Sequence, residues 1–556
     1  MRNMMNCMHK RFPVRRAFAL LLALCLLCVS ALAEYQDEAL TALAGAEGVV
    51  EGQMADDGIE WVENTYVAPT INMDADIQLG YVAASTAEIN PFNCTERDLV
   101  SLNQLVFESV VELDDEMKPQ PLLADSWSNQ GKKWTFKLRQ GVTFHNGAPL
   151  TASEVVGSYN RFMMTNELNP YYTRVQMISS MEIVDDLTLV VNSRYSGYVT
   201  LYAMTFPVVQ GSTLDDRMAR GTGPYWYTEY IPGTGVRLEA NPLWWKKDPQ
   251  IHSIAAVNFA DSGDALEALQ TNQINMLCTQ SSNAAVHRKL SDHTSMDYMT
   301  TTYELLVPNL NDDSVMGDVR MRQAVMYAID RANVAANAYR GMGIQCEVPV
   351  NPSSWLYESQ SAIYYYSPER ALQLIKECGW SDLTNDGKMN KVNGVMLEDL
   401  NIRIITYNES TTNIRENAAN LIANYLENVG FNVEVVVYSK SRCLQKVKDR
   451  AFDLALVGMQ FSESPNLAPL LQGGGSLNLN NFKNESMETA IGQLASAQTE
   501  EDLKSLYSQI QMIVVERLPV LGLLWRTGTV IASRSLAGLS GLRVGNMLNG
   551  IEFMTK

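Results

Sequence analysis

The residues of this chain that could carry chemistry are few and widely spaced. Histidine occurs only five times, and no pair of histidines has the H-E-x-x-H spacing of a zinc hydrolase. The chain lacks a G-x-S-x-G nucleophile turn, a G-x-x-x-x-G-K-[ST] phosphate loop and a complete dinucleotide fingerprint. These patterns favour no nucleophilic, metal or nucleotide chemistry. The 62 acidic residues still leave a glycosidase-type carboxylate pair open.

His145 is the histidine with the most structured surroundings, in TFHNGAPLTASEV at 143–155. The alternating WTFKLRQGVTF predicts two short strands before it, and Asn146-Gly147 is a hairpin-turn signal because glycine accepts positive φ. Thr151 and Glu154 then have the spacing of a capping box that opens a helix. Strand, turn and capped helix therefore adjoin, and His145 lies in the turn, where these patterns alone leave a catalytic and a scaffold role open.

One stretch imitates a calcium loop. Asp382, Thr384 and Asp386 precede Gly387 in the right order, but position twelve is Asn393, where a bidentate Glu is needed. A polar turn is the preferred interpretation. The sequence predicts no metal and no cofactor.

The N-terminal 33 residues are typical of a secretion signal. A basic start without acids is followed by the short apolar run AFALLLALCLLCV at 17–29, and Ala31-Leu32-Ala33 offers a cleavage site. Neither cysteine of this run follows a small residue, so no lipobox is present. Residues 34–74 are acidic and poor in large apolar side chains, which predicts a flexible spacer. We therefore expect an exported, extracytoplasmic protein, in the periplasm or on the outer face of the cell membrane.

Composition limits the partners and the architecture. The formal net charge of −19 argues against nucleic acid and anionic lipid. Five cysteines follow the signal at wide spacings, which is unlike a disulfide scaffold or a zinc cluster. At 556 residues the chain exceeds the roughly 250–300 at which a single core stops growing. Two or more lobes are required.

Hydrophobic periodicity predicts a mixed α/β chain. Helices are expected at 98–113, at 318–341 as one long helix closed by Gly341, and from Ser367-Pro368 onwards. Strands at 401–407, 432–438 and 452–458 alternate with helices, which indicates a parallel sheet with βαβ crossovers. A helix at 499–516 precedes a buried strand at 518–525.

Three ordered stretches together resemble the solute-binding proteins of family 5, which serve ABC importers of oligopeptides, dipeptides and nickel. They lie at 107–162 (FESVVELDDEM…YNRF), 221–245 (GTGPYWYTEY…LWW) and 318–331 (DVRMRQAVMYAIDR). The resemblance implies a two-lobed α/β fold of the type II periplasmic-binding-protein class, with mixed sheets. It places lobe 1 at 75–305 with 516–556 returning to it, and lobe 2 at 306–515. Two strands near 303–310 and 517–524 would join the lobes. The resemblance also implies that the FHNG segment is a structural hairpin before a capped helix of lobe 1, so that His145 is scaffold rather than catalyst.

The same resemblance implies a peptide site on extended segments from both lobes. Family members that bind peptides usually carry an Asp after the strand that corresponds to FDLALVG, where it pairs with the ligand ammonium; here the segment reads MQFSESP. Either Glu463 replaces that Asp, or the ligand has no free amino terminus there. The candidate ligand-binding residues are Ser85, Thr86, Ala87, Asn309, Met459, Gln460, Phe461, Ser462 and Glu463.

We therefore expect the substrate-binding subunit of an ABC importer rather than an enzyme. It would bind peptides between two closing lobes and deliver them, as a monomer, to permease subunits in the membrane. Three alternatives stay open: a binding protein of the same fold for a nickel chelate or an oligosaccharide, a secreted hydrolase with an unrecognised carboxylate pair, and a sensor module.

Overall fold

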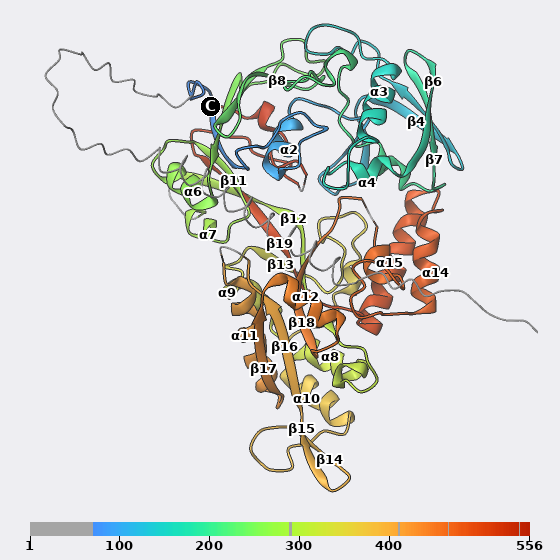
Figure 1. Ribbon diagram of the computed structural model, residues 1–556, viewed down its shortest axis with the longest axis vertical. Helices are drawn as coiled ribbons and strands as arrows, with labels where there is room; N and C mark the ends of the chain where they lie inside the picture. The colour runs from blue at the N-terminus through green and yellow to red at the C-terminus, as the bar shows by residue number, and fades with distance from the viewer. Residues whose placement is uncertain (1–69, 289–291, 410–411, 465, 544) are drawn as a thin grey trace, which may run out of the picture. The chain divides into compact units, whose positions relative to one another are not determined.

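Two long strands, β12 (His293–Pro308) and β19 (Leu521–Ser533), run antiparallel through the middle of an 11-stranded sheet. The computed structural model describes residues 70–556 except 289–291, 410–411, 465 and 544 (Figure 1), and these residues belong to one compact unit, Pro69–Lys556. The predicted signal and residues 34–69 of the predicted spacer lie outside the described residues. The two strands confirm the prediction that crossing strands join the lobes.

The large sheet is mixed and extends to both sides of this pair. On one side lie β18 (Leu454–Gln460), β16 (Asn401–Tyr407) and β17 (Asn432–Tyr438). On the other side lie β11 (Met276–Thr279), β1 (Ile77–Val82), β10 (Ser253–Phe259), β9 (Gly235–Ala240) and β8 (Tyr225–Ile231), while β13 (Gly343–Gln345) pairs with β19. Strands β16, β17 and β18 are parallel and are linked by α11 (Ile414–Glu427) and α12 (Lys440–Lys448), which confirms the predicted βαβ crossovers.

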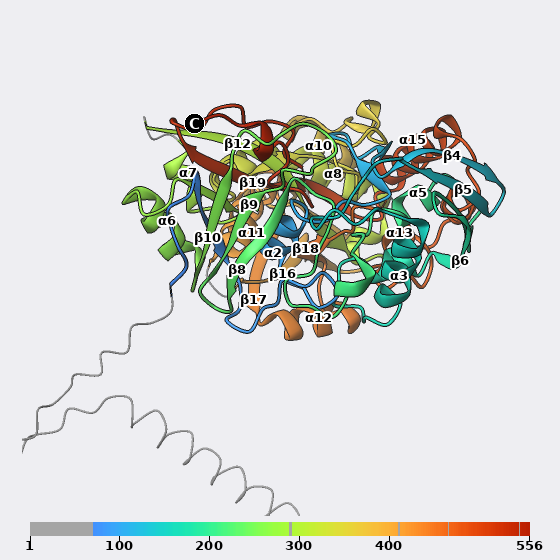
Figure 2. The same cartoon turned by 90° about the horizontal axis from the view of Figure 1, so that it is seen from above.

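Smaller sheets and helices surround the large sheet. A four-stranded sheet contains β4 (Ala124–Gln130), β5 (Lys133–Leu138), β7 (Thr188–Ser193) and β6 (Ile178–Asp185), and two hairpins contain β2 (Val111–Leu113) with β3 (Pro119–Pro121) and β14 (Asn390–Asn393) with β15 (Met396–Asp399). In Figures 1 and 2 alike, the four-stranded sheet and helix α6 (Ser262–Gln270) lie on opposite sides of β8–β10.

The remaining helices complete both lobes. Before β12 the chain forms α2 (Arg97–Asn103), α3 (Ala152–Phe162), α4 (Tyr172–Val175), α5 (Thr200–Ala203), η1 (Gly211–Thr213) and α7 (Ala284–His287). After β12 it forms η2 (Val315–Gly317), α8 (Val319–Ala328), α9 (Arg331–Asn337), η3 (Ser359–Ser361), α10 (Pro368–Glu377), α13 (Ala468–Leu471), α14 (Glu485–Leu494), α15 (Glu500–Arg517) and η4 (Ile551–Phe553). No helix among the described residues is long and apolar enough to cross a membrane.

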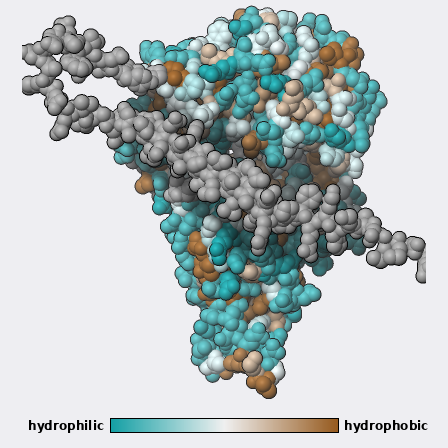
Figure 3. Space-filling view, in the orientation of Figure 1, coloured by the Kyte–Doolittle hydropathy of each residue, from teal (hydrophilic) through white to brown (hydrophobic). Residues whose placement is uncertain are grey.

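The visible surface of the described residues is mainly hydrophilic (Figure 3). An exception is the β14–β15 hairpin, where Val392, Val395 and Met396 are exposed. All five described cysteines are free thiols, and four of them are buried.

The predicted single helix over 98–113 is wrong. Helix α2 ends at Asn103, and the segment beyond it pairs as β2. The carbonyl of Leu105 accepts a hydrogen bond from the Tyr225 N–H (3.0 Å), and the carbonyl of Val106 accepts one from the Gly223 N–H (3.0 Å). A Cβ on Gly223 would lie 2.5 Å from the Leu105 carbonyl oxygen, so this close approach requires glycine. Tertiary hydrogen bonds have replaced those of a continued helix.

The predicted helix over 318–341 is two helices. Ile329 is extended between α8 and α9, and the Asp330 side chain accepts a hydrogen bond from the Asn333 N–H (2.9 Å) as a new N-cap. Gly341 does adopt positive φ, as predicted for a chain stop. An apolar periodicity that continues through the break concealed this second cap.

The predicted capping box at Thr151 is also absent. Thr151 is the N-cap of α3, but its side chain makes no capping hydrogen bond. The Glu154 carboxylate instead accepts from the N–H of Gly211 (2.5 Å), in the segment that follows β7 and α5. The helix begins where predicted, with its acidic residue used for tertiary contact.

His145 lies in a buried turn, and its ring nitrogens are both used. Nδ1 accepts from the N–H of Gly221, and Nε2 donates to the carbonyl of Gly223, each at 3.3 Å. Burial lowers the pKa of His145 to about 4, so the ring is neutral at pH 7. This geometry ties two of the quoted sequence stretches together and agrees with the interpretation of His145 as scaffold.

Candidate functional site

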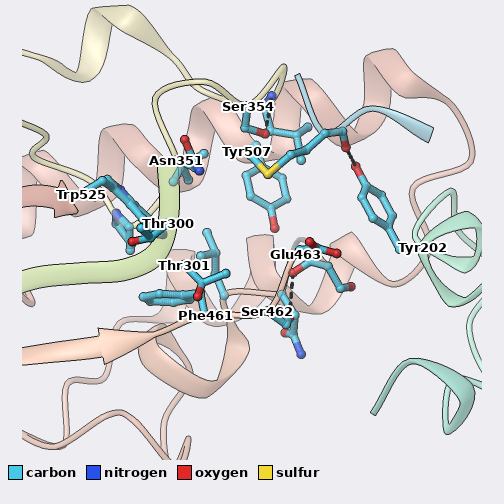
Figure 4. A pocket seen from close by; sticks show the side chains of 17 residues that line it. Tyr202, Thr300, Thr301, Asn351, Ser354, Phe461, Ser462, Glu463, Tyr507 and Trp525 are labelled. Atoms are coloured by element: carbon cyan, nitrogen blue, oxygen red, sulfur yellow. Dashed lines mark hydrogen bonds between the residues drawn. The ribbon is translucent and has the colours of Figure 1, made fainter. Parts of the chain in front are cut away.

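A cavity lies where β12, β19 and the end of β18 meet (Figure 4). Its empty volume is about 530 Å³, part of it open to solvent. It is lined by Met117, Tyr202, Thr300, Thr301, Pro349, Val350, Asn351, Ser354, Leu356, Phe461, Ser462, Glu463, Ser464, Asn466, Leu467, Tyr507 and Trp525. Residues of both predicted lobes therefore contribute to one site.

Phe461 and Trp525 form an aromatic wall of the cavity, with ring centroids 5.5 Å apart. The buried ring of Tyr303, which does not line the cavity, stacks on Trp525 with centroids 5.1 Å apart. Trp525 is in β19, Tyr303 is in β12, and Phe461 directly follows β18. Because all three come from adjacent strands of the sheet, this wall is held by the rigid part of the fold.

An irregularity in β12 opens the sheet at the cavity. The pairing of β12 with β19 shifts register between Met299 and Tyr303, and Thr300 and Thr301 of this interval line the cavity. The Thr300 hydroxyl donates to the carbonyl of Arg526 (2.9 Å), and the Thr301 carbonyl accepts from the N–H of Phe461 (2.9 Å). Such bulges re-aim side chains, and this one directs two threonines at the site.

Glu463 is the only ionisable carboxylate among the residues that line this cavity. Its Oε2 accepts from Nη2 of Arg174 at 2.7 Å, and the two side chains are only 10% and 11% exposed. Its Oε1 is buried and has no hydrogen-bond partner among the described residues. One oxygen of the carboxylate is thus committed to an ion pair, and the other is shielded from solvent without a partner among the described residues.

Tyr507 of α15 carries a second buried polar group without a partner among the described residues, its hydroxyl. Figure 4 shows its hydroxyl directed into the cavity, on the side where Glu463 lies. The side chain is 1% exposed and its hydroxyl has no partner among the described residues. Burial raises the pKa of Tyr507 well above its ordinary value, so the group remains a neutral phenol. Two residues that line this cavity, Glu463 and Tyr507, thus each carry a buried polar atom without a partner among the described residues.

A larger cavity of about 1500 Å³ lies on the other side of the 461–466 segment. It shares Phe461, Ser462, Ser464 and Asn466 with the first cavity, and Arg174 lines it. Its remaining lining comes mainly from the α4 region and from 468–495, which belong to different predicted lobes. The Arg174–Glu463 pair therefore lies where the two cavities adjoin.

The structure brings together only part of the predicted site. Phe461, Ser462 and Glu463 line the first cavity, and Gln460 lines the second together with Phe461 and Ser462. Met459 is buried in β18, opposite Tyr303 of β12.

The other predicted residues lie away from both cavities. Ser85 and Thr86 are exposed in the segment after β1, and the Ala87 carbonyl accepts from the hydroxyl of Tyr230. The Asn309 side-chain amide donates to the carbonyls of Phe452 (3.0 Å) and Arg450 (3.4 Å), which fixes the end of β12. A ligand-binding role for these residues stays a prediction.

Sequence reasoning missed most of the lining. The segment 349–356, PVNPSSWL, contributes five lining residues, and its two prolines are a signal for a loop. Tyr507 lies in a helix and Trp525 in a strand, and the sequence predicts both elements. It gives no indication of which face of either element lines a cavity. Nothing in the sequence pointed to Arg174, because its partner is 289 residues away.

No group of three His, Cys, Asp or Glu side chains that could hold a metal ion occurs among the described residues. In the calcium-like stretch, the Asp382 carboxylate accepts from the backbone N–H of Asp386 (3.2 Å) and Gly387 (3.0 Å). These bonds form the polar turn that the sequence favours.

Comparison with known proteins identifies relatives along most of the chain. The sequence model of bacterial extracellular solute-binding proteins, family 5, matches residues 118–480. Oligopeptide-binding protein AppA of Bacillus subtilis (strain 168) is 20% identical, over 83% of this chain and 88% of its own length. The dipeptide-binding protein of Escherichia coli (strain K12) is 24% identical, over 79% of this chain and 90% of its own.

A solved structure supports the fold. NikZ from Campylobacter jejuni, in complex with Ni(L-His), superposes with a TM-score of 0.65 at 20% identity, and the match covers 87% of this chain and 100% of NikZ. The two-lobed type II architecture expected from the sequence is therefore confirmed.

Proposed function

Because the chain belongs to bacterial extracellular solute-binding protein family 5, we propose that it is the substrate-binding subunit of an ABC importer for peptides. In this role it lies outside the cytoplasm, binds a peptide between its two lobes and delivers it to permease subunits in the membrane. It performs no covalent chemistry.

The observation that carries this proposal is the composition of the first cavity. It combines the aromatic wall of Phe461 and Trp525 with a few polar groups, and Glu463 and Tyr507 each have a buried atom without a partner among the described residues. Peptides offer N–H donors, carbonyl acceptors and apolar side chains, so they can satisfy such a lining at every point. Two relatives are named for binding oligopeptides and dipeptides, which supports the same substrate class.

The cavity also bears on the hydrolase alternative. Hydrolysis of glycosides in the usual way needs two carboxyl groups that flank the scissile bond, roughly 5–10 Å apart. Among the described residues that line this cavity, Glu463 is the sole carboxylate and it is ion-paired. This lining favours binding over turnover.

Binding between lobes implies a change in their separation. A ligand that contacts Phe461 of one predicted lobe and Tyr202 of the other is held more tightly when the lobes are closed. Ligand binding therefore shifts the population toward the closed state, which the permease can recognise. Small-angle scattering tests this step, since ligand should reduce the radius of gyration.

Native mass spectrometry of the protein, purified without denaturation from its host, tests the substrate class. A tight ligand survives purification, because saturation at a hundred times Kd adds about 2.7 kcal/mol of stability. We expect a set of added masses that fragment as peptides. A single mass containing nickel would instead favour a chelate, which the nickel-bound NikZ neighbour makes the second candidate. Sustained turnover of peptides or glycans would contradict the binding role.

A paired variant localises the ligand. Ser462 is exposed and lines both cavities, so Ser462→Trp fills ligand space without disturbing the core. The matched control is Ser128→Trp, an exposed position on β4 that lines neither cavity. We expect the first variant to lose the added masses and the control to keep them. Loss in neither would place the ligand elsewhere.

A further inference from the structure

The charged side chains of the two cavities form one matched pair. Among the described residues, Glu463 is the only charged side chain that lines the first cavity, and Arg174 is the only one that lines the second. They are bound to each other at 2.7 Å, so the combined lining is electrically neutral.

Arg174 is held in place independently of any ligand. Its Nη1 donates to the hydroxyl of Thr205 at 2.8 Å, and its guanidinium lies 5.3 Å from the ring centroid of Tyr171. Thr205 and Tyr171 are both buried. A guanidinium fixed by an acceptor on one side and an aromatic face on the other keeps its position, and therefore keeps Glu463 neutralised.

Glu463 is equally fixed, with one oxygen left over. Its Oε1 lies where a Cβ of residue 545 would be, so Gly545 leaves the space that the carboxylate occupies. That oxygen is buried beside Gly545 and accepts no hydrogen bond from the described residues. Because Glu463 lines the first cavity, a ligand group that reaches this oxygen can satisfy it only by donating a hydrogen bond.

We propose that Arg174 is a specificity-determining residue, which makes this site select a peptide group that donates to Glu463 without carrying a positive charge. A free ammonium at Oε1 would share one carboxylate with the Arg174 guanidinium, and the two like charges oppose each other. An amide N–H gains the same hydrogen bond without that repulsion. The substrates are thus peptides whose group at Glu463 is an internal, cyclic or blocked amide. This inference rests on the proposed peptide function.

Matched peptide pairs test the inference. An equimolar tetrapeptide library is prepared in two forms, with free and with N-acetylated amino termini, and the forms compete for the protein in native mass spectrometry. We expect wild type to enrich the acetylated form by about tenfold or more. Arg174→Gln should reverse the preference, because Glu463 then carries an uncompensated charge. Arg174→Lys should retain the acetylated preference.

A control variant and a second variant keep the test decisive if Arg174→Gln fails to fold. Arg161→Gln removes the surface Arg161–Asp215 pair (3.0 Å), which lines neither cavity, and should keep the wild-type ratio. Glu463→Gln leaves Arg174 uncompensated, so binding of the free-amine form should fall further. If Arg174→Gln does not fold, this variant decides the question.

The outcomes separate two failures. If peptides bind but wild type prefers free amines, or the folded Arg174→Gln variant keeps the wild-type ratio, the assignment of Arg174 is overturned and the peptide function stands. If neither form of the library binds wild type, the proposed peptide function fails, and this inference fails with it.

Discussion

Two buried ion pairs of this molecule differ in what they leave unsatisfied. Glu304 of β12 accepts from Nε and Nη2 of Arg415 at 2.9 and 2.8 Å, so both of its oxygens are bound, and Glu304 is 0% exposed. Glu463, which lines a cavity, has one oxygen bound to Arg174 and one without a partner among the described residues. We call Glu304–Arg415 the closed pair, because both carboxylate oxygens are bound. We call Glu463–Arg174 the open pair, because one carboxylate oxygen is not.

The difference separates a structural charge from a ligand-binding one. Around the first pair, Arg526 and Arg415 also contact Glu409, at 2.8 and 3.1 Å, and the Tyr407 ring lies 4.7 Å from Arg415. Both carboxylate oxygens of Glu304 are therefore bound, and both arginines have a second carboxylate partner in Glu409. An ion pair with an unused, desolvated oxygen retains affinity for a further donor. The comparison therefore predicts which variants affect stability and which affect binding.

The largest expected effect is on the closed pair. Glu304→Ala leaves the Arg415 charge with only the partly exposed Glu409 as a partner in a buried site, which costs about 3–5 kcal/mol of unfolding free energy. Denaturant unfolding measures the loss. The control is Glu434→Gln, whose pair with Arg403 (2.7 Å) is half exposed and should change stability by less than about 1 kcal/mol. Equal losses in both variants would remove the distinction.

His145 gives a pH-dependent test of a second closed polar site. Its folded pKa of about 4 lies below the unfolded value of about 6.5, so the unfolded chain takes up the proton first. Its contribution is fully present above pH 6.5 and is lost as pH falls to 4, by about 3 kcal/mol in all. His145→Gln should flatten this part of the stability curve while ligand affinity at pH 7 is unchanged. Lost affinity would contradict the scaffold role.

The open pair should respond in binding more than in stability. Glu463→Gln leaves Arg174 bonded to Thr205 and close to a cavity that admits water, so we expect a loss of about 1–2 kcal/mol in unfolding free energy. The affinity for library peptides should change in the same variant. A stability loss as large as that of Glu304→Ala, with unchanged affinity, would show that the pair is structural.

The smallest expected effect is at Thr205. Thr205→Val removes the acceptor for Nη1 of Arg174 and costs about 1 kcal/mol, measured by denaturant unfolding. Because Arg174 keeps Glu463 as its partner, the ratio of acetylated to free-amine peptide bound should move only slightly toward the free amine. A full reversal would mean that Thr205, rather than the ion pair, sets the preference.

The sequence predicted the fold of the molecule better than the residues of its candidate site. The three stretches that resemble the family contain buried side chains held by specific hydrogen bonds. His145 of the first stretch bonds to Gly221 of the second, and Arg322 of the third bonds to the backbone carbonyls of Met316 and Arg517. Such contacts need particular residue types, so they leave a signature. None of these residues lines either cavity, so they identify the family and leave the substrate open.

The site depends on contacts that local patterns do not encode. Arg174 and Glu463 are paired across 289 positions, and Tyr507 sits on a helix whose amphipathic pattern has no mark for the turn that faces the cavity. Glu463 is a candidate ligand-binding residue because its segment, 459–463, follows the strand after which peptide-binding family members contact the ligand. Its existing partner was not foreseeable, and that partner changes the chemistry expected there.

A crystal structure of the protein with a bound tetrapeptide from the acetylated library shows directly which ligand group lies at Glu463. We expect an uncharged N–H of the ligand at hydrogen-bond distance from Glu463 Oε1, with the Arg174–Glu463 pair intact and the ligand against Phe461 and Trp525. A ligand that displaces Arg174 with a free ammonium, or that binds away from this cavity, would contradict it.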